Sequence, residues 1–186
     1  GNRPIVEYMT FNFSLVGIDQ IINNAAKIRQ MSGGQFNCPI VFRGPTASAG
    51  QLAATHSQAF ENWFANCPGL KVIVPSNPYD AKGLLLSSIF DNNPVVFLEH
   101  RWLYNQVGNV PNKEYKIPLK KAKVIKKGNA ITIVSMSYMT IEALKTINFL
   151  KQIENNEGET LISEGIDANY LDMINYAVFA LIKLEK

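Results

Sequence analysis

The stretch KVIVPSNPYDAKGLLLSSIFDNNPVVFL, residues 71–98, predicts a strand, a helix and a second strand in immediate succession. Apart from Lys71, its first and last four residues are apolar and rich in β-branched side chains, and residues 79–90 between them have helical character. Asn77 can cap this helix, with Pro78 at the first helical position. Strands that are joined through a helix in this way are typical of a parallel sheet.

The same alternation continues on both sides of this stretch. Toward the N-terminus the first predicted helix ends at Ser32-Gly33-Gly34, which is a typical C-terminal stop. The expected fold class is therefore α/β, with a parallel sheet flanked by helices. The remaining expected segments are strands at 4–8 and 38–43, helices at 13–31 and 56–66, two antiparallel segments within 117–133, a strand at 130–135, and helices at 140–150 and 168–184.

Length and composition limit the class of protein. The chain has 186 residues, enough for one domain plus an appendage, and its 47% hydrophobic and 18% charged residues exclude disorder for most of it. The net charge of +3 gives no argument for nucleic acid, and no run of 18 apolar residues indicates a membrane span. The two cysteines, Cys38 and Cys67, cannot form a disulfide framework. We therefore expect a cytoplasmic protein that binds neither nucleic acid nor membrane.

Candidate site residues lie just after the predicted strands. Phe11 and Phe13 follow the first strand, Arg43-Gly44-Pro45 follows the second, and His56 lies farther on. Ligands of an open parallel sheet bind beyond the carboxyl ends of its strands, so these groups are expected in one crevice. A stacking ring and a histidine that carries protons fit a flat ligand. Taken singly, a phenylalanine is more often a core residue, and a histidine such as His100 more often a surface or satisfied polar residue.

Motifs of self-contained hydrolases, nucleoside triphosphatases and zinc enzymes are missing, but six other motifs follow one another in a distinctive order. They are EYMTFNF (7–13), FRGP (42–45), HSQ (56–58), PGLKV (68–72), DAKGL (80–84) and DNNPV (91–95). With these motifs, residues 1–152 resemble the beta subunit of thiamine-diphosphate-dependent 2-oxo acid dehydrogenases of the pyruvate dehydrogenase type. The resemblance implies a transketolase-like pyrimidine-binding fold, which receives the aminopyrimidine of thiamine diphosphate while an alpha subunit holds diphosphate and magnesium.

The resemblance also implies roles for individual residues. Phe13 matches the ring that stacks on the aminopyrimidine, and His56 matches the active-site histidine that faces the substrate and the lipoyl acceptor. The family binds a structural potassium ion largely through main-chain carbonyls, which leave no side-chain signature. The matching positions are Ile40, Ser88, Asp91 and Asn93. The implied partners are an alpha subunit and a second beta subunit in a heterotetramer, a lipoyl acyltransferase component and a 2-oxo acid substrate.

The first predicted helix, with Asp19, Gln20 and Asn23, matches a segment packed between subunits. A solvated helix face explains these polar residues equally well. In the family, a glutamate that bonds the pyrimidine is expected upstream of the first strand. No residue of this chain matches it, so we expect no turnover by the chain alone.

The expected domains are a pyrimidine-binding domain without its N-terminal part (1–115), a linker and start of a C-terminal domain (116–152), and a tail of unknown origin (153–186). The tail is faintly similar to a terminal helix of some all-helical nucleotide pyrophosphohydrolases, and a fusion or a frameshift also explains it. One alternative function is a noncatalytic fragment or remnant that only associates with partner subunits. Another is a different transketolase-like enzyme, such as transketolase or deoxyxylulose-phosphate synthase, but the FRGP and HSQ motifs favour the dehydrogenase.

Overall fold

The structure, a computed structural model, describes residues 1–47, 52–128 and 131–155. The chain divides into two compact units, residues 1–121 and 122–186. The predicted helix at 168–184 lies outside the described residues, as does most of the predicted tail. The domain boundaries expected after residues 115 and 152 stay predictions.

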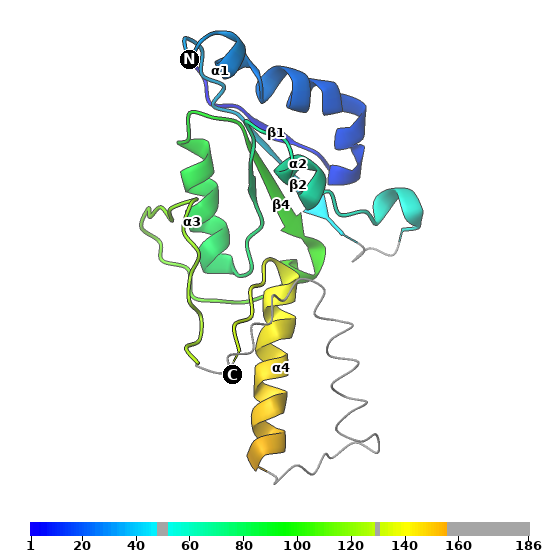
Figure 1. Ribbon diagram of the computed structural model, residues 1–186, viewed down its shortest axis with the longest axis vertical. Coiled ribbons are helices and arrows are strands. Elements are labelled where there is room, and N and C mark those ends of the chain that lie inside the picture. The colour runs from blue at the N-terminus through cyan, green and yellow to red at the C-terminus, as the bar shows by residue number, and fades with distance from the viewer. Residues whose placement is uncertain (48–51, 129–130, 156–186) are drawn as a thin grey trace. The chain divides into compact units, whose positions relative to one another are not determined.

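The first unit is built on a sheet of four parallel strands (Figure 1). The strands are β1 (Ile5–Glu7), β2 (Val41–Thr46), β3 (Lys71–Ile73) and β4 (Val95–His100). Their order across the sheet is β1-β2-β4-β3, so β2 and β4 each have a partner on both sides. In this register Val41 lies opposite both Ile5 and Val95. The predicted fold class, a parallel sheet flanked by helices, is confirmed.

Alternate side chains of the two inner strands build a core on each face of the sheet. Phe42, Val96 and Leu98 belong to one core, and Val41, Val95 and Phe97 belong to the other. The helical segment 11–31 and α2 (Glu61–Ala65) cover the first face, whereas α3 (Pro78–Ile89) covers the second (Figure 1).

The strand–helix–strand stretch folds as its sequence predicts. The side chain of Asn77 accepts a hydrogen bond of 2.8 Å from the Asp80 N–H, and Pro78 is the first residue of α3. This cap satisfies one of the free N–H groups of the first turn. Strand β2 starts at Val41, three residues later than predicted, and extends through Thr46.

The first predicted helix is helical but irregular. It consists of a 3₁₀ helix η1 (Phe11–Gly17), a π-helical turn η2 (Gln20–Ala25) and a short α1 (Ile28–Met31). Within it, the Asp19 carboxylate accepts hydrogen bonds from the side chains of Asn23 (2.7 Å) and Asn24 (3.3 Å), and the Asp19 carbonyl also accepts from Asn24 (3.4 Å). Such side-chain bonds compete with the regular helical ladder.

The second predicted helix, at 56–66, is broken in two. The structure has a 3₁₀ turn η4 (Ala54–His56) and then α2, with Ser57, Gln58 and Ala59 outside both. The Gln58 N–H donates to the Asn12 side chain at 2.9 Å, and the Gln58 carbonyl accepts from the Ala47 N–H at 3.1 Å. Because both groups bond distant parts of the chain, they take no part in a continuous helix.

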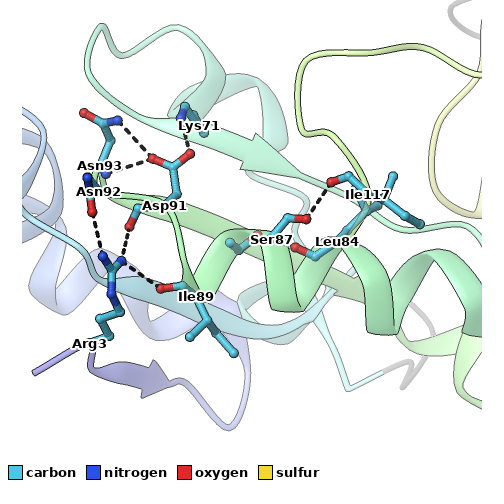
Figure 2. Close-up of polar contacts among 10 residues, drawn as sticks. Arg3, Lys71, Leu84, Ser87, Ile89, Asp91, Asn92, Asn93 and Ile117 are labelled. Atoms are coloured by element: carbon cyan, nitrogen blue, oxygen red, sulfur yellow. Dashed lines mark hydrogen bonds and ion pairs between the residues drawn. The ribbon is translucent and has the colours of Figure 1, made fainter. Parts of the chain in front are cut away.

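Residues after β4 form no further strand within the described ranges 101–128 and 131–155, so the hairpin expected within 117–133 and the strand expected at 130–135 are wrong. A 3₁₀ turn η5 (Arg101–Asn105) leads into an irregular segment, residues 106–118, that runs along α3. The Ile117 N–H donates to the Gly83 carbonyl (3.2 Å). Figure 2 shows the second bond, in which the Ile117 carbonyl accepts from the Ser87 hydroxyl (2.6 Å). Bonds to a helix therefore satisfy a backbone that was expected to pair as a strand.

The described part of the second unit contains the helix α4 (Tyr138–Asn155). It confirms the helix predicted at 140–150 and is longer at both ends. Over the described ranges, no helix combines the length and the apolar character needed to cross a membrane.

Gly69 lets the backbone lie closer to the Ala26 carbonyl than we expect any other residue to allow. Its φ is +104°, and a Cβ there would collide with the Ala26 carbonyl oxygen. We expect Gly69→Ala to lower the free energy of unfolding by about 3 kcal/mol, because a left-handed backbone costs roughly 1–2 kcal/mol and overpacking roughly 1–3 kcal/mol. Urea denaturation measures this loss.

The matched control is Gly33→Ala. Gly33 also has a positive φ, +61°, but a Cβ at this residue would meet no neighbouring side chain or backbone atom within 4 Å. Only the backbone cost of about 1 kcal/mol is expected there. Equal losses in the two variants would contradict the collision at Gly69.

Candidate functional site

The residues expected to meet cofactor and substrate, Phe13 and His56, lie in contact. Their ring centroids are 5.1 Å apart and their planes are inclined by 88°, so the edge of one ring meets the face of the other. The Phe13 residue is 47% exposed, which leaves part of its ring accessible to a ligand. The structure therefore brings together an aromatic surface and an imidazole from two separate turns, after β1 and after β2.

Asn12 connects the two turns. It is only 3% exposed, and both ends of its amide are bonded. Its Oδ1 accepts from the Gln58 N–H (2.9 Å), and its Nδ2 donates to the Thr10 hydroxyl (2.7 Å). The Thr10 carbonyl in turn accepts from the Phe13 N–H (3.1 Å). Nothing in the sequence pattern singles out Asn12, although a polar residue between two aromatic rings, if buried, needs such partners.

Arg43, Gly44 and Pro45, which were predicted to follow the second strand, lie within β2 and pack against the segment that leads to Phe13. A Cβ on Gly44 would lie 2.6 Å from the Tyr8 carbonyl oxygen and 3.2 Å from the Phe11 ring, so glycine allows this approach. The Tyr8 N–H donates to the Arg43 carbonyl at 2.9 Å. Phe11 is 1% exposed and belongs to the core, in contrast to Phe13.

Charged side chains at the carboxyl ends of the strands form a network. Arg43 donates to both carboxylate oxygens of Glu99 at 2.9 Å and lies 3.4 Å from Glu7. The Tyr104 hydroxyl donates to Glu99 at 2.8 Å. The hydrogen bond to Glu99 raises the pKa of Arg43, and burial together with the bond to Glu99 raises the pKa of Tyr104. The network thus ties β1, β2, β4 and η5 together.

A cavity of about 340 Å³ opens beside this network. Burial lowers the pKa of His100, which lies in its wall, and the His100 Nδ1 accepts a bond of 3.3 Å from the Trp102 N–H. His100 is therefore a satisfied polar residue, whereas Phe13 and His56 lie outside this cavity. Its lining also includes Arg43, Asn77, Phe97, Glu99 and Tyr104.

The four positions expected to hold potassium lie where α3 ends and where β2 and β4 begin. The Ile40 carbonyl accepts from the Val95 N–H (2.9 Å), and the Ser88 carbonyl accepts from the Asp91 N–H (3.2 Å). Arg3 donates to the Asp91 carbonyl at 2.8 Å (Figure 2). Because a carbonyl oxygen has two lone pairs, the Ile40 and Asp91 carbonyls still have a site for an ion, whereas the Ser88 carbonyl also accepts from the Phe90 N–H.

The Asp91 side chain is engaged by other groups. It forms an ion pair with Lys71 and accepts from the main chain and the side chain of Asn93, both at 2.9 Å (Figure 2). Burial raises the pKa of Asp91, but the bonds from Lys71 and Asn93 outweigh it and hold this pKa below its usual value. The described residues contain no group of three His, Cys, Asp or Glu that could bind a metal. An ion at this place would depend on main-chain oxygens.

Glu61, the first residue of α2, is half-buried close to the site. Burial raises the pKa of its carboxyl group, and a hydrogen bond with Thr46 only partly offsets this effect. Thr46 is the last residue of β2, and its hydroxyl also donates to the Gln58 carbonyl at 3.4 Å. Ionised Glu61, beside the His56 turn, therefore destabilises the folded state.

Two families match parts of the chain. Residues 1–106 match the family described as "Transketolase, pyrimidine binding domain". Residues 126–184 match the family described as "Nucleotide modification associated domain 1", a range that includes α4 and most of the predicted tail.

Several relatives share one name, pyruvate dehydrogenase E1 component subunit beta. The protein from Rickettsia conorii is 48% identical over 151 residues, which are 81% of this chain and 46% of that protein. The human mitochondrial protein is 52% identical over 141 residues, 74% of this chain and 39% of that protein. The Porphyra purpurea protein is 46% identical over 175 residues, 94% of this chain and 50% of that protein. The chain spans about half, or less, of the length of these curated relatives.

A solved structure described as "Split gene transketolase, inactive beta4 tetramer" has a similar fold. Its TM-score is 0.63 at 19% sequence identity, and the match covers 82% of this chain and 46% of that chain. This likeness supports the parallel-sheet architecture.

The raised pKa of Glu61 gives a pH-dependent prediction. Ionisation of a carboxyl group with a raised pKa destabilises the folded state, so the cost is absent below the unfolded pKa of about 4.3 and grows as pH rises through the folded pKa. We expect Glu61→Gln to raise the free energy of unfolding at pH 7 and to lose this advantage below about pH 4. Urea denaturation across this pH range measures the difference.

Glu114→Gln is the matched control, because Glu114 is an exposed glutamate whose carboxylate lies 3.8 Å from Lys116. Glu114→Gln should show no comparable gain in the free energy of unfolding at pH 7. A Glu61→Gln variant that is less stable than the parent at pH 7 would contradict the destabilising effect assigned to ionised Glu61.

Proposed function

This chain belongs to the family of transketolase pyrimidine-binding domains, and from this premise we propose that it is part of the beta subunit of a pyruvate dehydrogenase. In this proposal it serves the decarboxylating component that oxidises a 2-oxo acid and transfers the acyl group to lipoyl. The observation that carries the proposal is the contact of Phe13 with His56 at the carboxyl edge of the sheet. Identities of 46–52% to the named beta subunits favour this enzyme over transketolase, which is represented at 19%.

Phe13 is the residue proposed to hold the aminopyrimidine of thiamine diphosphate. Its partly exposed ring fits a flat heteroaromatic ligand, because such rings stack with offset faces. When bound, the cofactor supplies a carbon nucleophile for the 2-oxo acid. An alpha subunit would hold the diphosphate and magnesium.

His56 is the residue proposed to exchange a proton with the substrate or the lipoyl acceptor. Its Nδ1 lies 3.0 Å from the Thr55 hydroxyl, so Nε2 is the nitrogen left for this exchange. Contact with the Phe13 ring places the imidazole beside the proposed cofactor surface.

The proposed partners are an alpha subunit, a second beta subunit and a lipoyl acyltransferase component. Met9 and Val16 are exposed near Phe13, and such apolar side chains are typical of a surface that a partner subunit covers. A potassium ion at Ile40, Ser88, Asp91 and Asn93 would be structural, since Ile40 precedes β2 whereas Phe13 follows β1, at the opposite end of the strands. Both cysteines are free, which is compatible with the proposed cytoplasmic location.

Removing the Phe13 ring should weaken cofactor binding. In the chain assembled with its alpha subunit, we expect Phe13→Ala to reduce thiamine diphosphate affinity about fivefold, since a stacked aromatic pair contributes about 1 kcal/mol. Isothermal titration calorimetry measures this affinity. Phe36→Ala, which removes another exposed ring, is the control and should leave it unchanged. Equal affinity of Phe13→Ala and the parent would contradict the assigned role.

Replacing His56 should affect acyl transfer more than cofactor binding. In the assembled enzyme we expect His56→Gln to slow transfer to a lipoyl domain by about 100-fold or more, the usual effect of losing a general acid–base group. Thiamine diphosphate affinity should stay within about twofold of the parental value. This is much less than a tenfold change, which corresponds to about 1.4 kcal/mol. His100→Gln is the control histidine variant. Parental transfer rates in His56→Gln would exclude the proposed proton exchange.

A further inference from the structure

We propose that Asn12 is a positioning residue that fixes the relative orientation of Phe13 and His56. The proposal rests on the function proposed above for these two residues. It is carried by the hydrogen bonds of the Asn12 side chain, which join the turn after β1 to the turn that follows η4.

Asn12 lies between the two turns. Phe13 is its immediate neighbour, and Gln58, whose N–H its Oδ1 accepts at 2.9 Å, is two residues beyond His56. Its Nδ2 donates to Thr10 at 2.7 Å, which fixes the rotation of the amide. A displacement of either end of this side chain therefore moves Phe13 and His56 relative to each other.

The chain around Gln58 lacks a regular hydrogen-bond ladder. Residues 57–59 lie outside helix and strand, between η4 and α2. The Gln58 carbonyl is tied to the end of β2, through the Ala47 N–H (3.1 Å) and the Thr46 hydroxyl (3.4 Å). Asn12 supplies the complementary bond at the Gln58 N–H, so the turn is held from the β1 side as well.

Removal of the Asn12 amide is expected to release the turn that contains Gln58. Asn12→Ala removes the buried hydrogen-bond partner of the Gln58 N–H and of the Thr10 hydroxyl. Because unsatisfied buried polar groups are unfavourable, the turn that contains Gln58 is expected to move so that these groups find other hydrogen-bond partners. The Phe13 and His56 rings then lose their perpendicular contact. A displacement of about 1 Å in a catalytic constellation can cost about 100-fold in rate.

The test uses histidine ring resonances of the full chain, which contains two histidines, so a His100→Gln variant assigns them. The Phe13 ring current shifts the ring protons of His56, and a Phe13→Leu variant gives their position without that ring. We expect Asn12→Ala to move the His56 resonances toward their position in Phe13→Leu, with the circular dichroism spectrum of the parent retained. Asn12→Asp should keep the parental ring-current shift, measured against Asn12→Asp combined with Phe13→Leu so that the effect of the new charge cancels, because a carboxylate still accepts from the Gln58 N–H and from the Thr10 hydroxyl.

Asn23→Ala is the matched control, since Asn23 is an exposed asparagine whose side chain bonds Asp19. It should leave the His56 resonances in place. Should Asn12→Ala fail to fold, Asn12→Ser takes its place, because its hydroxyl is one atom too short to reach Gln58. Parental His56 resonances in the folded variant overturn the proposal, and so does loss of folding in both variants, which assigns Asn12 to stability alone.

The resonance measurement contains no cofactor, so its outcome is independent of the proposed function. In the assembled enzyme, the same variant should lower kcat for acyl transfer more than it weakens thiamine diphosphate binding. If the His56 resonances move but the parent binds no thiamine diphosphate, the positioning role holds and the proposed function fails.

Discussion

The structure of the first unit depends on the double pairing of β2, which forms parallel ladders with β1 on one side and with β4 on the other. Because all three strands run in the same direction, the segments that follow them emerge at one edge. This places Glu7, Arg43 and Glu99 within one ion-pair network. It also brings the Phe13 turn next to the His56 turn, which no local interaction along the chain could do.

Short-range contacts then adjust what the sheet has brought together. Gly44 lets the end of β2 approach Tyr8, and Asn12 joins the turns on either side of this approach. The site is therefore a composite of two irregular turns held by a regular sheet. This arrangement explains why the predicted helix at 56–66 is interrupted. The Gln58 N–H and carbonyl form hydrogen bonds with Asn12 and Ala47, and not with backbone groups of a helix.

Local sequence patterns predict the elements whose stability is local. The Asn77 cap and the glycine stop after Met31 both act within a few residues, and the structure has each of them. The bonds of Asn12 and Ile117 join residues far apart in the chain, so no local pattern shows them. For this reason the alternation within 117–133 indicates a hairpin that does not form. Resemblance to a family, rather than residue type alone, is what distinguishes Phe13 and His56 from other aromatic and histidine residues of the chain.

We propose that the exposed surface of Phe13, beside His56, receives the aminopyrimidine of thiamine diphosphate. A crystal structure of the chain assembled with its alpha subunit and bound to thiamine diphosphate is the decisive test of this role of Phe13. We expect the aminopyrimidine to stack on the Phe13 ring, with His56 facing the reactive carbon side of the cofactor. An aminopyrimidine bound away from Phe13 would contradict it.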